Sequence, residues 1–451
     1  MVAESLTLFE RERFEEFRDA RERGEDSGHI RVYQDDIDAG QYTADDLFRI
    51  GDGIFGHEFR DLDGYGDDPA VRPGQRVHDG ARGGRDNFSC FGCHSVGGPD
   101  GAGAATQNAY LFGDGNDLDS TVVRNAPSLL GGGMVQELAH EISLELQRQR
   151  NTASASAGER GHALTVELTG KGISFGRVTV FPDGDVDTSE VEGVDPDLTV
   201  RPFGWKGQFP TLRRAAEDAA RVHFGIQSSV IAERHQNDSA PELLGPGPDW
   251  WDPDADGKQR ELEEGSLTAI AVYLATLEVP TIVPPYSAAL RDRWARGDAL
   301  FDQTGCADCH VRSLSMANTV WLEHPDTTEA PPFEVELFND GEQPKGTPQV
   351  KLFSDLKRHD MGPALAERHT DTSTPNVPAA TWLTRPLWGL AESAPYLHDG
   401  RAATIPEAIL AHGGEAQDSR DAFAALSAED QASLHVFLLS LSRTPKLRGP
   451  Q

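Results

Sequence analysis

The sequence predicts a mainly α-helical protein of two similar halves, with long loops and a small β-hairpin insertion. Three observations lead to this fold class. In most of the apolar segments, apolar residues recur every three to four positions, which is the spacing of one face of an α-helix. One stretch, residues 163–182, instead alternates apolar and polar residues. A C-x-x-C-H motif occurs once in each half, at residues 90–94 and 306–310. The 451 residues are enough for two or three domains.

In the first half, residues 1–44 are expected to form a charged helical extension. Further helices are expected at residues 45–58, 134–150, 211–224 and 267–277, the last with Ser266 as its N-cap. Between them, residues 61–87 and 95–117 are rich in Gly and are expected to be loops. Residues 163–182 predict a hairpin, within an insertion of about residues 160–200.

A proline-rich break at residues 278–285 marks the best domain boundary. It divides the chain into the extension 1–44, a first domain 45–280 that contains the insertion, and a second domain 281–451. A helix at 287–301 is expected to lead into the second motif, and a last helix begins at a capping box, Ser427 to Asp430. That helix should bury Leu434, Phe437, Leu438 and Leu441. Gly51…Phe55 and Gly297…Phe301 precede the two motifs at the same internal spacing, which indicates a diverged repeat.

Composition excludes several classes of partner. The chain holds 41 Lys and Arg against 74 Asp and Glu, a net charge of −33. No basic stripe exists to neutralise phosphates, so we expect neither a nucleic-acid partner nor docking on an anionic membrane. A basic protein would be attracted, although a salt-rich habitat explains the charge equally well. No run of 18 apolar residues occurs, so no membrane span is expected.

The two C-x-x-C-H motifs are the attachment pattern of c-type haem. Two thiols at this spacing reach the two vinyl groups, and the following His binds iron from one side. The motifs use all four cysteines, so the thioether anchors and proximal ligands are Cys90, Cys93, His94, Cys306, Cys309 and His310. A Cys₄ zinc site is the alternative, and the long separation of the pairs argues against it.

The sixth iron ligands decide the chemistry, because a Met suits electron transfer and an open site permits reaction with peroxide. Met361 lies 51 residues past His310 and is assigned as the distal ligand of the second haem; a core Met is the alternative. Met316 is too close to His310 for the opposite face. Met134 could ligate the first haem, but its helical apolar pattern favours core packing.

A second metal pattern occurs at residues 252–263. It reads D-x-D-x-D-G-x₅-E, with Asp252, Asp254, Asp256 and Glu263 as candidate ligands. Oxygen ligands at alternating positions and a bidentate glutamate suit calcium. A bare acidic loop in an Asp-rich chain is an equally good interpretation.

Longer stretches of the sequence resemble a known family. The stretches are LTRPLWGL at 383–390, APYLHDGRAAT at 394–404, HGGEA at 412–416, FSDL at 353–356, HDMG at 359–362 and FGWK at 203–206. They resemble bacterial di-haem cytochrome c peroxidases and MauG proteins, and are most similar to the branch called di-haem oxidoreductases. The resemblance is weak over about residues 45–145 and good over 200–443.

The resemblance implies two cytochrome c-like haem domains with a calcium ion between the haems. The first haem would react with peroxide, and the second would be six-coordinate and pass electrons, with Met361 as its ligand. Trp205 matches the tryptophan that relays electrons between haems, although a core aromatic is the alternative. Asn125, Thr384 and Pro386 match the family's calcium ligands.

Two departures affect the expected site. The distal histidine of many family members is replaced by Tyr110, so the first iron is expected to be open or water-bound. The family's pocket Gln and Glu fall on Ala215 and Gly225. Three other residues could supply the missing acid–base group: Glu137, Glu217 and His223.

These features together predict an exported, periplasmic di-haem oxidoreductase that reacts with hydrogen peroxide or another small oxidant. Electrons would come from a small redox protein, or a protein substrate would be oxidised, and homodimerisation stays open. The N-terminal residues lack the apolar core of a signal peptide, so any export signal is absent from this chain. The alternatives are an electron-transfer cytochrome with both irons six-coordinate and a ligand-binding sensor or scaffold.

Overall fold

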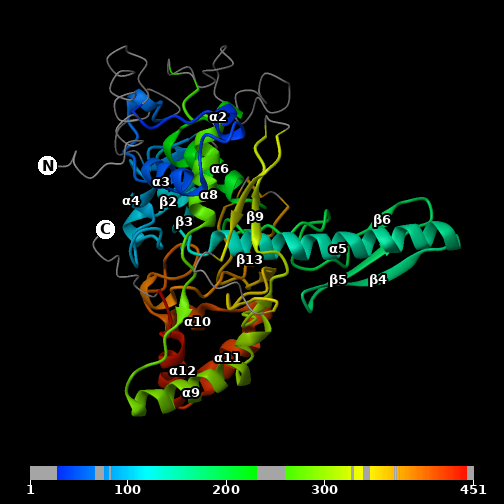
Figure 1. The fold of residues 1–451 in the computed structure, drawn as a ribbon. Helices are drawn as coiled ribbons and strands as arrows, with labels where there is room; N and C mark the ends of the chain where they lie inside the picture. The colour runs from blue at the N-terminus through cyan, green and yellow to red at the C-terminus, as the bar shows by residue number, and fades with distance from the viewer. Residues whose placement is uncertain are drawn as a thin grey trace.

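The computed structural model describes residues 28–66, 76–80, 83–230, 258, 260–326, 330–338, 346–369, 371, 373–374 and 376–443. Helices make up most of its regular structure, and small sheets of two or three strands make up the rest (Figure 1). Most of the expected extension lies outside these residues; residues 28–33 are not helical, and a short helix follows, α2 (Gln34–Asp38). No helix among the described residues combines the length and apolar character needed to cross a membrane.

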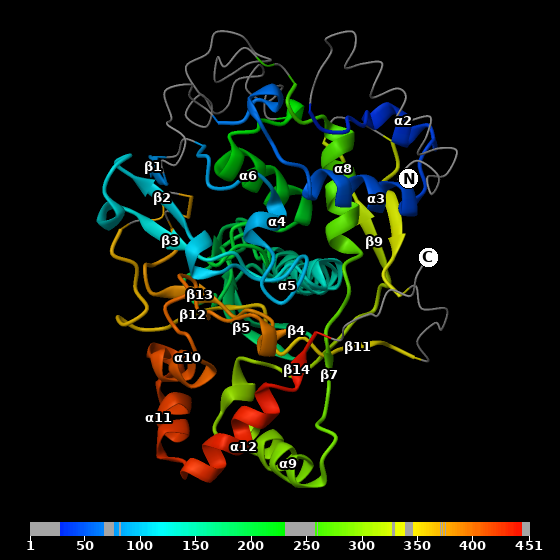
Figure 2. The ribbon, with the colours of Figure 1, turned by 90° about the vertical axis from the view of Figure 1, so that its left-hand side faces the viewer.

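Helices of the first half lie toward one end of the molecule, apart from α5, which crosses its middle (Figure 2). They are α3 (Ala44–Phe55), α4 (Cys90–Cys93), α5 (Gly132–Arg160), α6 (Leu212–Phe224) and α8 (Glu264–Ala275). A capping box of Thr43 and Asp46 begins α3. Helix α3 packs on α8 at Gly51, where a Cβ atom would collide with the Ala269 carbonyl and the Tyr273 side chain. The glycine therefore allows the two helices to touch.

The opposite end repeats this contact with helices of the second half (Figure 2). They are α9 (Ala288–Gln303), α10 (Ile405–Ala411), α11 (Gln417–Ala425) and α12 (Ala428–Leu438). Helix α9 packs on α12 at Gly297, where a Cβ atom would collide with the Ser433 carbonyl and the Phe437 side chain. Each half thus crosses the helix before its C-x-x-C-H motif with its last helix, at a glycine four residues before a buried phenylalanine, Phe55 or Phe301. The expected internal repeat is present in the packing.

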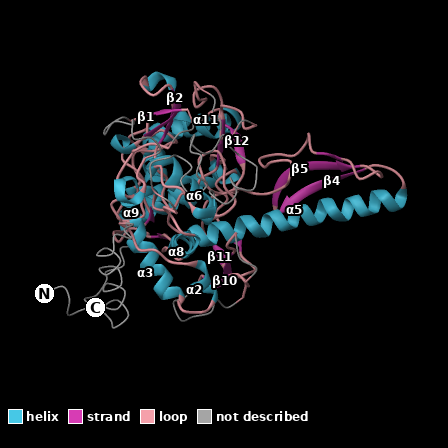
Figure 3. Ribbon diagram, turned by 90° about the horizontal axis from the view of Figure 1, so that it is seen from above, coloured by secondary structure: helices cyan, strands magenta, loops and turns pink. Residues whose placement is uncertain are grey.

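The expected hairpin is confirmed and forms part of an arm that projects from the body (Figures 1 and 3). Strands β4 (Leu164–Gly170), β5 (Ile173–Val180) and β6 (Val186–Asp187) form an antiparallel sheet. The sheet buries one face, including Leu168, Phe175 and Val178, against α5. Helix α5 is longer than expected because its outer half is the surface that covers this sheet.

The remaining strands are short and connect distant segments. They are β1 (Val77–Asp79), β2 (Ala109–Gly113), β3 (Val122–Arg124), β7 (Thr281–Ile282), β8 (Leu314–Ser315), β9 (Val320–Glu323), β10 (Phe333–Glu336), β11 (Gln349–Val350), β12 (Arg358–Asp360), β13 (Thr381–Leu383) and β14 (Leu441–Ser442). The pairs are β1–β2–β3, β7–β14, β8–β11, β9–β10 and β12–β13. Strand β2 lies where only loop was expected; it pairs in parallel with the distant β1 and antiparallel with β3, which follows it closely in the sequence.

Two further observations modify the sequence-based picture. Trp321 of β9 and Val335 of β10 pack in the same apolar cluster as α3 and α8, so the second half contributes to the core of the first. Ser266 is not an N-cap: α8 begins after Glu263, and the Ser266 hydroxyl lies inside the core, where it accepts a hydrogen bond from the Val32 N–H at 3.1 Å. A buried hydroxyl at that position serves packing between segments rather than the end of a helix.

Candidate functional site

The first C-x-x-C-H motif forms a single turn, α4, followed by His94. Both thiols are half-buried and free. Nδ1 of His94 lies 3.0 Å from the Pro127 carbonyl and 3.3 Å from the Gly101 carbonyl, so it donates to backbone oxygens. Burial lowers the pKa of His94 to about 4. The imidazole is therefore neutral at physiological pH, with Nε2 left for a metal.

The second motif has the same arrangement. A 3₁₀ turn, η5 (Cys306–Asp308), leads into Cys309 and His310. Nδ1 of His310 lies 3.0 Å from the Phe353 carbonyl, and burial lowers the pKa of this histidine to about 4. No described residue hydrogen-bonds to Nε2 of either motif histidine.

The donor atoms fit two c-type haems. Burial raises the pKa of the Cys90 thiol to about 12 and that of Cys93 to about 11, so both are protonated thiols when no group is bound. Among the described residues, no cluster that could hold a metal brings the two cysteine pairs together. The Cys₄ zinc alternative therefore fails, and each motif presents two free thiols beside one oriented imidazole.

His223 stands near His94 and is held by a buried carboxylate. It lies in the last turn of α6, and its Nδ1 is 2.7 Å from Asp86 Oδ2; the other oxygen of Asp86 is 3.0 Å from His78 Nε2. Burial alone would lower the pKa of His223, but the hydrogen bond and charge of Asp86 raise it above its ordinary value. The pKa of Asp86 is lowered because the hydrogen bonds from both histidines outweigh burial. The carboxylate therefore stays ionised and holds His223 through Nδ1, while no described residue hydrogen-bonds to Nε2 of His223.

A half-buried arginine, Arg385, also influences His94. The charges of His223 and Arg385 both act to lower the pKa of His94, so both lie within electrostatic range of it. Burial lowers the pKa of Arg385 to about 10, and no carboxylate of the described residues forms an ion pair with it. Its guanidinium lies 5.8 Å from the centre of the Trp205 ring. An unpaired, half-buried cation of this kind can stabilise negative charge on a ligand.

Trp205 joins the two halves. Its indole N–H donates to the Asn125 carbonyl at 2.7 Å, and its own carbonyl accepts from the Leu383 N–H at 3.0 Å. Trp205 thus contacts Asn125 and the residue before Thr384; Asn125 and Thr384 are two of the expected calcium ligands. Both amide N–H groups of Asn125 are donated inside the protein, which leaves Oδ1 available. The Thr384 carbonyl accepts from the Ser354 hydroxyl at 2.6 Å, and Pro386 is half-buried.

Comparison with known proteins identifies the family. Residues 168–441, more than half of the chain, match the family model described as "Di-haem oxidoreductase, putative peroxidase". The chain belongs to the di-haem oxidoreductase family. The matched range contains the second C-x-x-C-H motif and begins after the first.

Two solved structures are similar to parts of this di-haem oxidoreductase. One is hydrazine synthase of Kuenenia stuttgartiensis, with 19% identity and a TM-score of 0.26 over 40% of this chain and 57% of that chain. The other is a MauG-like protein associated with microbial copper homeostasis, with 16% identity and a TM-score of 0.28 over 69% and 89% of the two chains. TM-scores this low do not establish a shared fold. No curated protein matches the sequence.

The two other acid–base candidates of the oxidoreductase have different surroundings. Both carboxylate oxygens of Glu217 are bound, one by Arg214 at 2.7 Å and one by the Ser228 hydroxyl at 2.6 Å. Glu137 lies on α5 and accepts from the Asn318 amide at 3.0 Å, and burial raises its pKa. His223 is the candidate with electrostatic reach to His94 and a free reactive nitrogen. Sequence spacing gave no signal for its partner Asp86, whose contact spans 137 positions.

Met361 lies just after β12, beside the second motif of the oxidoreductase. Its N–H donates to the Ala380 carbonyl at 2.9 Å, and its own carbonyl lies 3.0 Å from where a Cβ on Gly413 would be. His412, the residue before Gly413, donates Nδ1–H to the Ala408 carbonyl at 2.8 Å. The charge of His412 acts to lower the pKa of His310. The structure therefore places a second candidate ligand, His412, next to Met361. Met134 is buried in an apolar cluster with Leu138 and Trp388.

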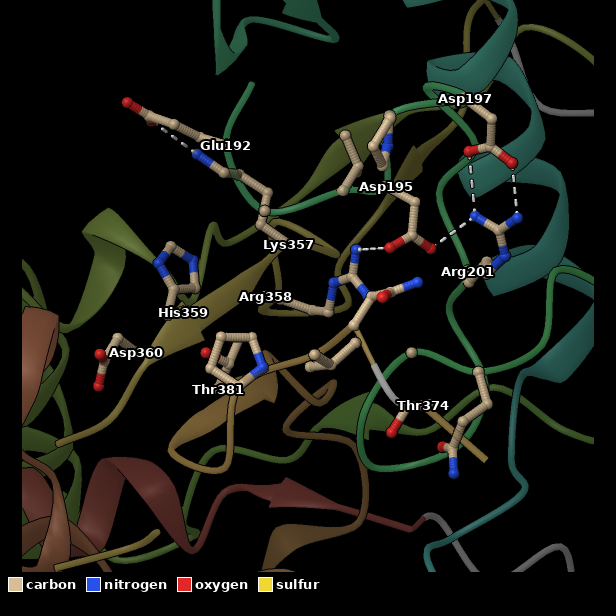
Figure 4. Close-up of a pocket in the computed structure, with 18 of the residues that line it drawn as sticks. Glu192, Asp195, Asp197, Arg201, Lys357, Arg358, His359, Asp360, Thr374 and Thr381 are labelled. Atoms are coloured by element: carbon tan, nitrogen blue, oxygen red, sulfur yellow. Dashed lines mark hydrogen bonds and ion pairs between the residues drawn. The ribbon is translucent and has the colours of Figure 1, made fainter. Parts of the chain in front are cut away.

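A pocket of about 1000 Å³ lies between the base of the arm and β12 (Figure 4). Its cations are paired within its own wall: Arg201 with Asp197 at 2.6 Å, and Arg358 with Asp195 at 2.5 Å. His359 at its edge is held by Asp355 and Glu415. Lys357 is paired with Glu192 at 3.7 Å, whereas the Asp360 carboxylate has no ion-pair partner among the described residues, so the pocket wall carries no unpaired cation.

The acidic pattern at residues 252–263 is described only in part. Asp252, Asp254 and Asp256 lie outside the described residues. Glu263 is buried, and Arg260 binds both of its oxygens at 2.9 and 3.0 Å. In the described part of the loop, Glu263 thus binds an arginine, whereas the calcium interpretation requires it to bind a metal ion.

Proposed function

We propose that this oxidoreductase binds two c-type haems covalently and reacts with hydrogen peroxide, or another small oxidant, at the first. When bound, each haem supplies redox-active iron. Cys90 and Cys93 would anchor the first haem and Cys306 and Cys309 the second, with His94 and His310 as proximal ligands. The observation that carries the proposal is the Asp86-supported His223 near His94, since a carrier of electrons needs no such acid–base group.

The residues near His94 have distinct roles in this proposal. Asp86 holds the proton on Nδ1 of His223, so Nε2 accepts the proton from one peroxide oxygen. The same nitrogen then returns that proton to the other oxygen, which leaves as water. Arg385 stabilises the negative charge that develops as the oxygen–oxygen bond breaks.

In this proposal the two halves of the chain form two haem domains with different roles. Each helix crossing, α3 with α8 and α9 with α12, supports one cytochrome c-like domain, with a boundary near residue 280. Trp205, bonded to both halves, would relay electrons between them, and Asn125, Thr384 and Pro386 would hold the calcium ion that the family resemblance implies. The charge of −33 favours a basic redox protein as donor, or a basic protein substrate. The proposal also includes a periplasmic location and leaves homodimerisation open.

The ferric electron paramagnetic resonance spectrum tests this function. We expect one high-spin and one low-spin signal, because the first iron has an open position and the second does not. Addition of hydrogen peroxide should change the high-spin signal. Two low-spin signals that peroxide leaves unchanged would show an electron carrier instead. Cyanide or CO binding without turnover of peroxide would indicate a sensor.

Replacement of Met361 with alanine should convert the second haem to high spin, since its sulfur is the proposed sixth ligand. The ferric absorption spectrum measures this change. His412→Ala is the matched comparison, because His412 lies beside Met361 and has a free Nε2. Conversion in the His412 variant, with an unchanged Met361 variant, would assign the ligand to the histidine.

Replacement of Trp205 with phenylalanine should slow electron sharing between the haems several-fold or more, because the indole and its hydrogen bond to the Asn125 carbonyl are lost, while the backbone bond to Leu383 stays. Stopped-flow absorption of the half-reduced protein measures the rate. Trp294→Phe is the control, because Trp294 lies on α9 and takes no part in the proposed relay. Equal rates in the Trp205 variant and the parent would exclude the relay.

A further inference from the structure

Three potential metal ligands converge outside the haem motifs and outside the range that the family model matches. They are His29, which precedes α2; His57, which follows the end of α3; and Asp63, the last residue of the 3₁₀ turn η1 (Asp61–Asp63). Residues more than 30 positions apart thus meet at one point. Neither the haem anchors nor the proposed peroxide chemistry uses them.

The contacts are close and largely enclosed. Nδ1 of His29 lies 3.1 Å from Asp63 Oδ1, and Nε2 of His57 lies 3.0 Å from Asp63 Oδ2. One ligand atom from each of the three residues lies within 4.8 Å of the others. The side chains of His29 and Asp63 are 0% and 1% exposed, whereas His57 is 21% exposed. Solvent can therefore reach the cluster from the side of His57.

The spacing resembles that of ligands around a metal ion. Zinc binds imidazole nitrogen and carboxylate oxygen at about 2.0–2.2 Å, so tetrahedral ligands lie roughly 3.3 Å apart. The two nitrogen–oxygen distances in the cluster are close to this value, and the ligand nitrogens of the two histidines lie within 4.8 Å of each other. Two imidazoles and one carboxylate, without sulfur, suit a borderline divalent ion rather than calcium or copper(I).

The ring packing holds the ligands in place. Phe59 contacts both imidazoles, with ring centres 5.8 Å from His29 and 5.1 Å from His57. The Arg60 N–H donates to Asp63 Oδ2 at 3.0 Å, which fixes the carboxylate from the far side. Phe59 in turn stacks on Phe224 at 5.1 Å, so the cluster is tied to the end of α6. Fixed ligands need little reorganisation when an ion binds.

We propose that His29, His57 and Asp63 form a binding site for a divalent first-row transition ion of the zinc class, separate from the haems. Three protein ligands bind the ion, and water takes the fourth position on the exposed side of His57. The ion links the segment before α2 to the end of α3. Its role is to fix this N-terminal segment against the core.

Metal analysis of the haem-loaded, full-length protein tests the site. The protein is freed of loosely bound metal with a chelator, dialysed against buffered Zn²⁺, and analysed for zinc and iron by mass spectrometry. The variants are His57→Ala and Asp63→Asn. His162→Ala is the control, because His162 is an exposed histidine whose Nδ1 lies 3.2 Å from the Arg160 carbonyl, far from the proposed ligands in sequence. We expect one more zinc per chain in the parent and the control than in the two variants, with affinity at least about 100-fold weaker in the variants.

Thermal melting separates a metal site from a hydrogen-bonded cluster and guards against misfolding. Zn²⁺ should raise the Tm of the parent and of His162→Ala, and leave that of His57→Ala unchanged, since a bound ion stabilises the folded state. His57 is partly exposed, so its variant is expected to fold even if Asp63→Asn does not. Equal zinc content in the parent and the folded His57 variant, with no zinc-dependent shift in Tm, would overturn the proposal.

Discussion

Replacing His223 with glutamine is expected to slow the reaction with hydrogen peroxide by about 100- to 10,000-fold, the usual contribution of a positioned acid–base group. Glutamine keeps the length and polarity of the side chain but cannot take up a proton. Stopped-flow measurement of the second-order rate constant with peroxide gives the effect. Spectra of the resting ferric variant should match the parent, because His223 is not an iron ligand in this proposal.

Glu217→Gln is the comparison that discriminates between the acid–base candidates. Both oxygens of Glu217 are held by Arg214 and Ser228, so its replacement should change the rate far less than that of His223. If the glutamate variant lost the larger factor, the assignment of the acid–base role to His223 would be wrong.

The pH dependence follows from the hydrogen bond to Asp86. Burial lowers the pKa of His223, but Asp86 outweighs it and raises this pKa above 6.5. The base form is therefore lost as the pH falls through a value above 6.5, and the rate should fall with it. In Asp86→Asn the raising interaction is gone and burial remains, so the fall should move to lower pH. A profile that did not move would show that another group limits the rate.

The sequence was most informative where function requires fixed local spacing. The C-x-x-C-H motifs, the alternation of the hairpin and the glycine before each phenylalanine are patterns within a few residues, and the structure confirms the hairpin and the repeat. In the sequence the glycines indicate only a repeat, whereas in the structure they lie at the two helix crossings. Where two helices touch this closely, a residue without a side chain is required, so the two glycines mark the helix crossings in the sequence.

The parts that could not be predicted depend on contacts between distant residues. Asp86 lies in a Gly-rich stretch that reads as loop, and its role becomes clear only when the fold brings it to His223. Arg385 lies in the LTRPLWGL stretch that resembles the family. That it has no carboxylate partner among the described residues can be seen only in the folded structure. Ser266 has the residue type of a cap and is instead a buried acceptor for Val32, because tertiary packing decides between the two uses.

The most complete change is expected from removal of the thioether anchors. Replacing Cys90 and Cys93 together with alanine should remove one covalent haem, and replacing Cys306 and Cys309 should remove the other. The chain has no other cysteine, so no alternative thioether can form. Intact-protein mass spectrometry should show two haem additions to the 49.0 kDa parent polypeptide, and one in each double variant.

The two double variants should also differ in how the remaining haem responds to hydrogen peroxide. The variant that keeps only the first haem retains His94, His223 and Asp86, so peroxide should still alter its spectrum, although no second haem can share the oxidising equivalents. The variant that keeps only the second should be low-spin and unresponsive to peroxide, because Met361 or His412 fills its sixth position. A parent protein with the bare polypeptide mass would remove the basis for both halves of the proposal. A peroxide response that followed the second motif would reverse the roles given to the two haems, since the acid–base pair would then stand beside the wrong iron.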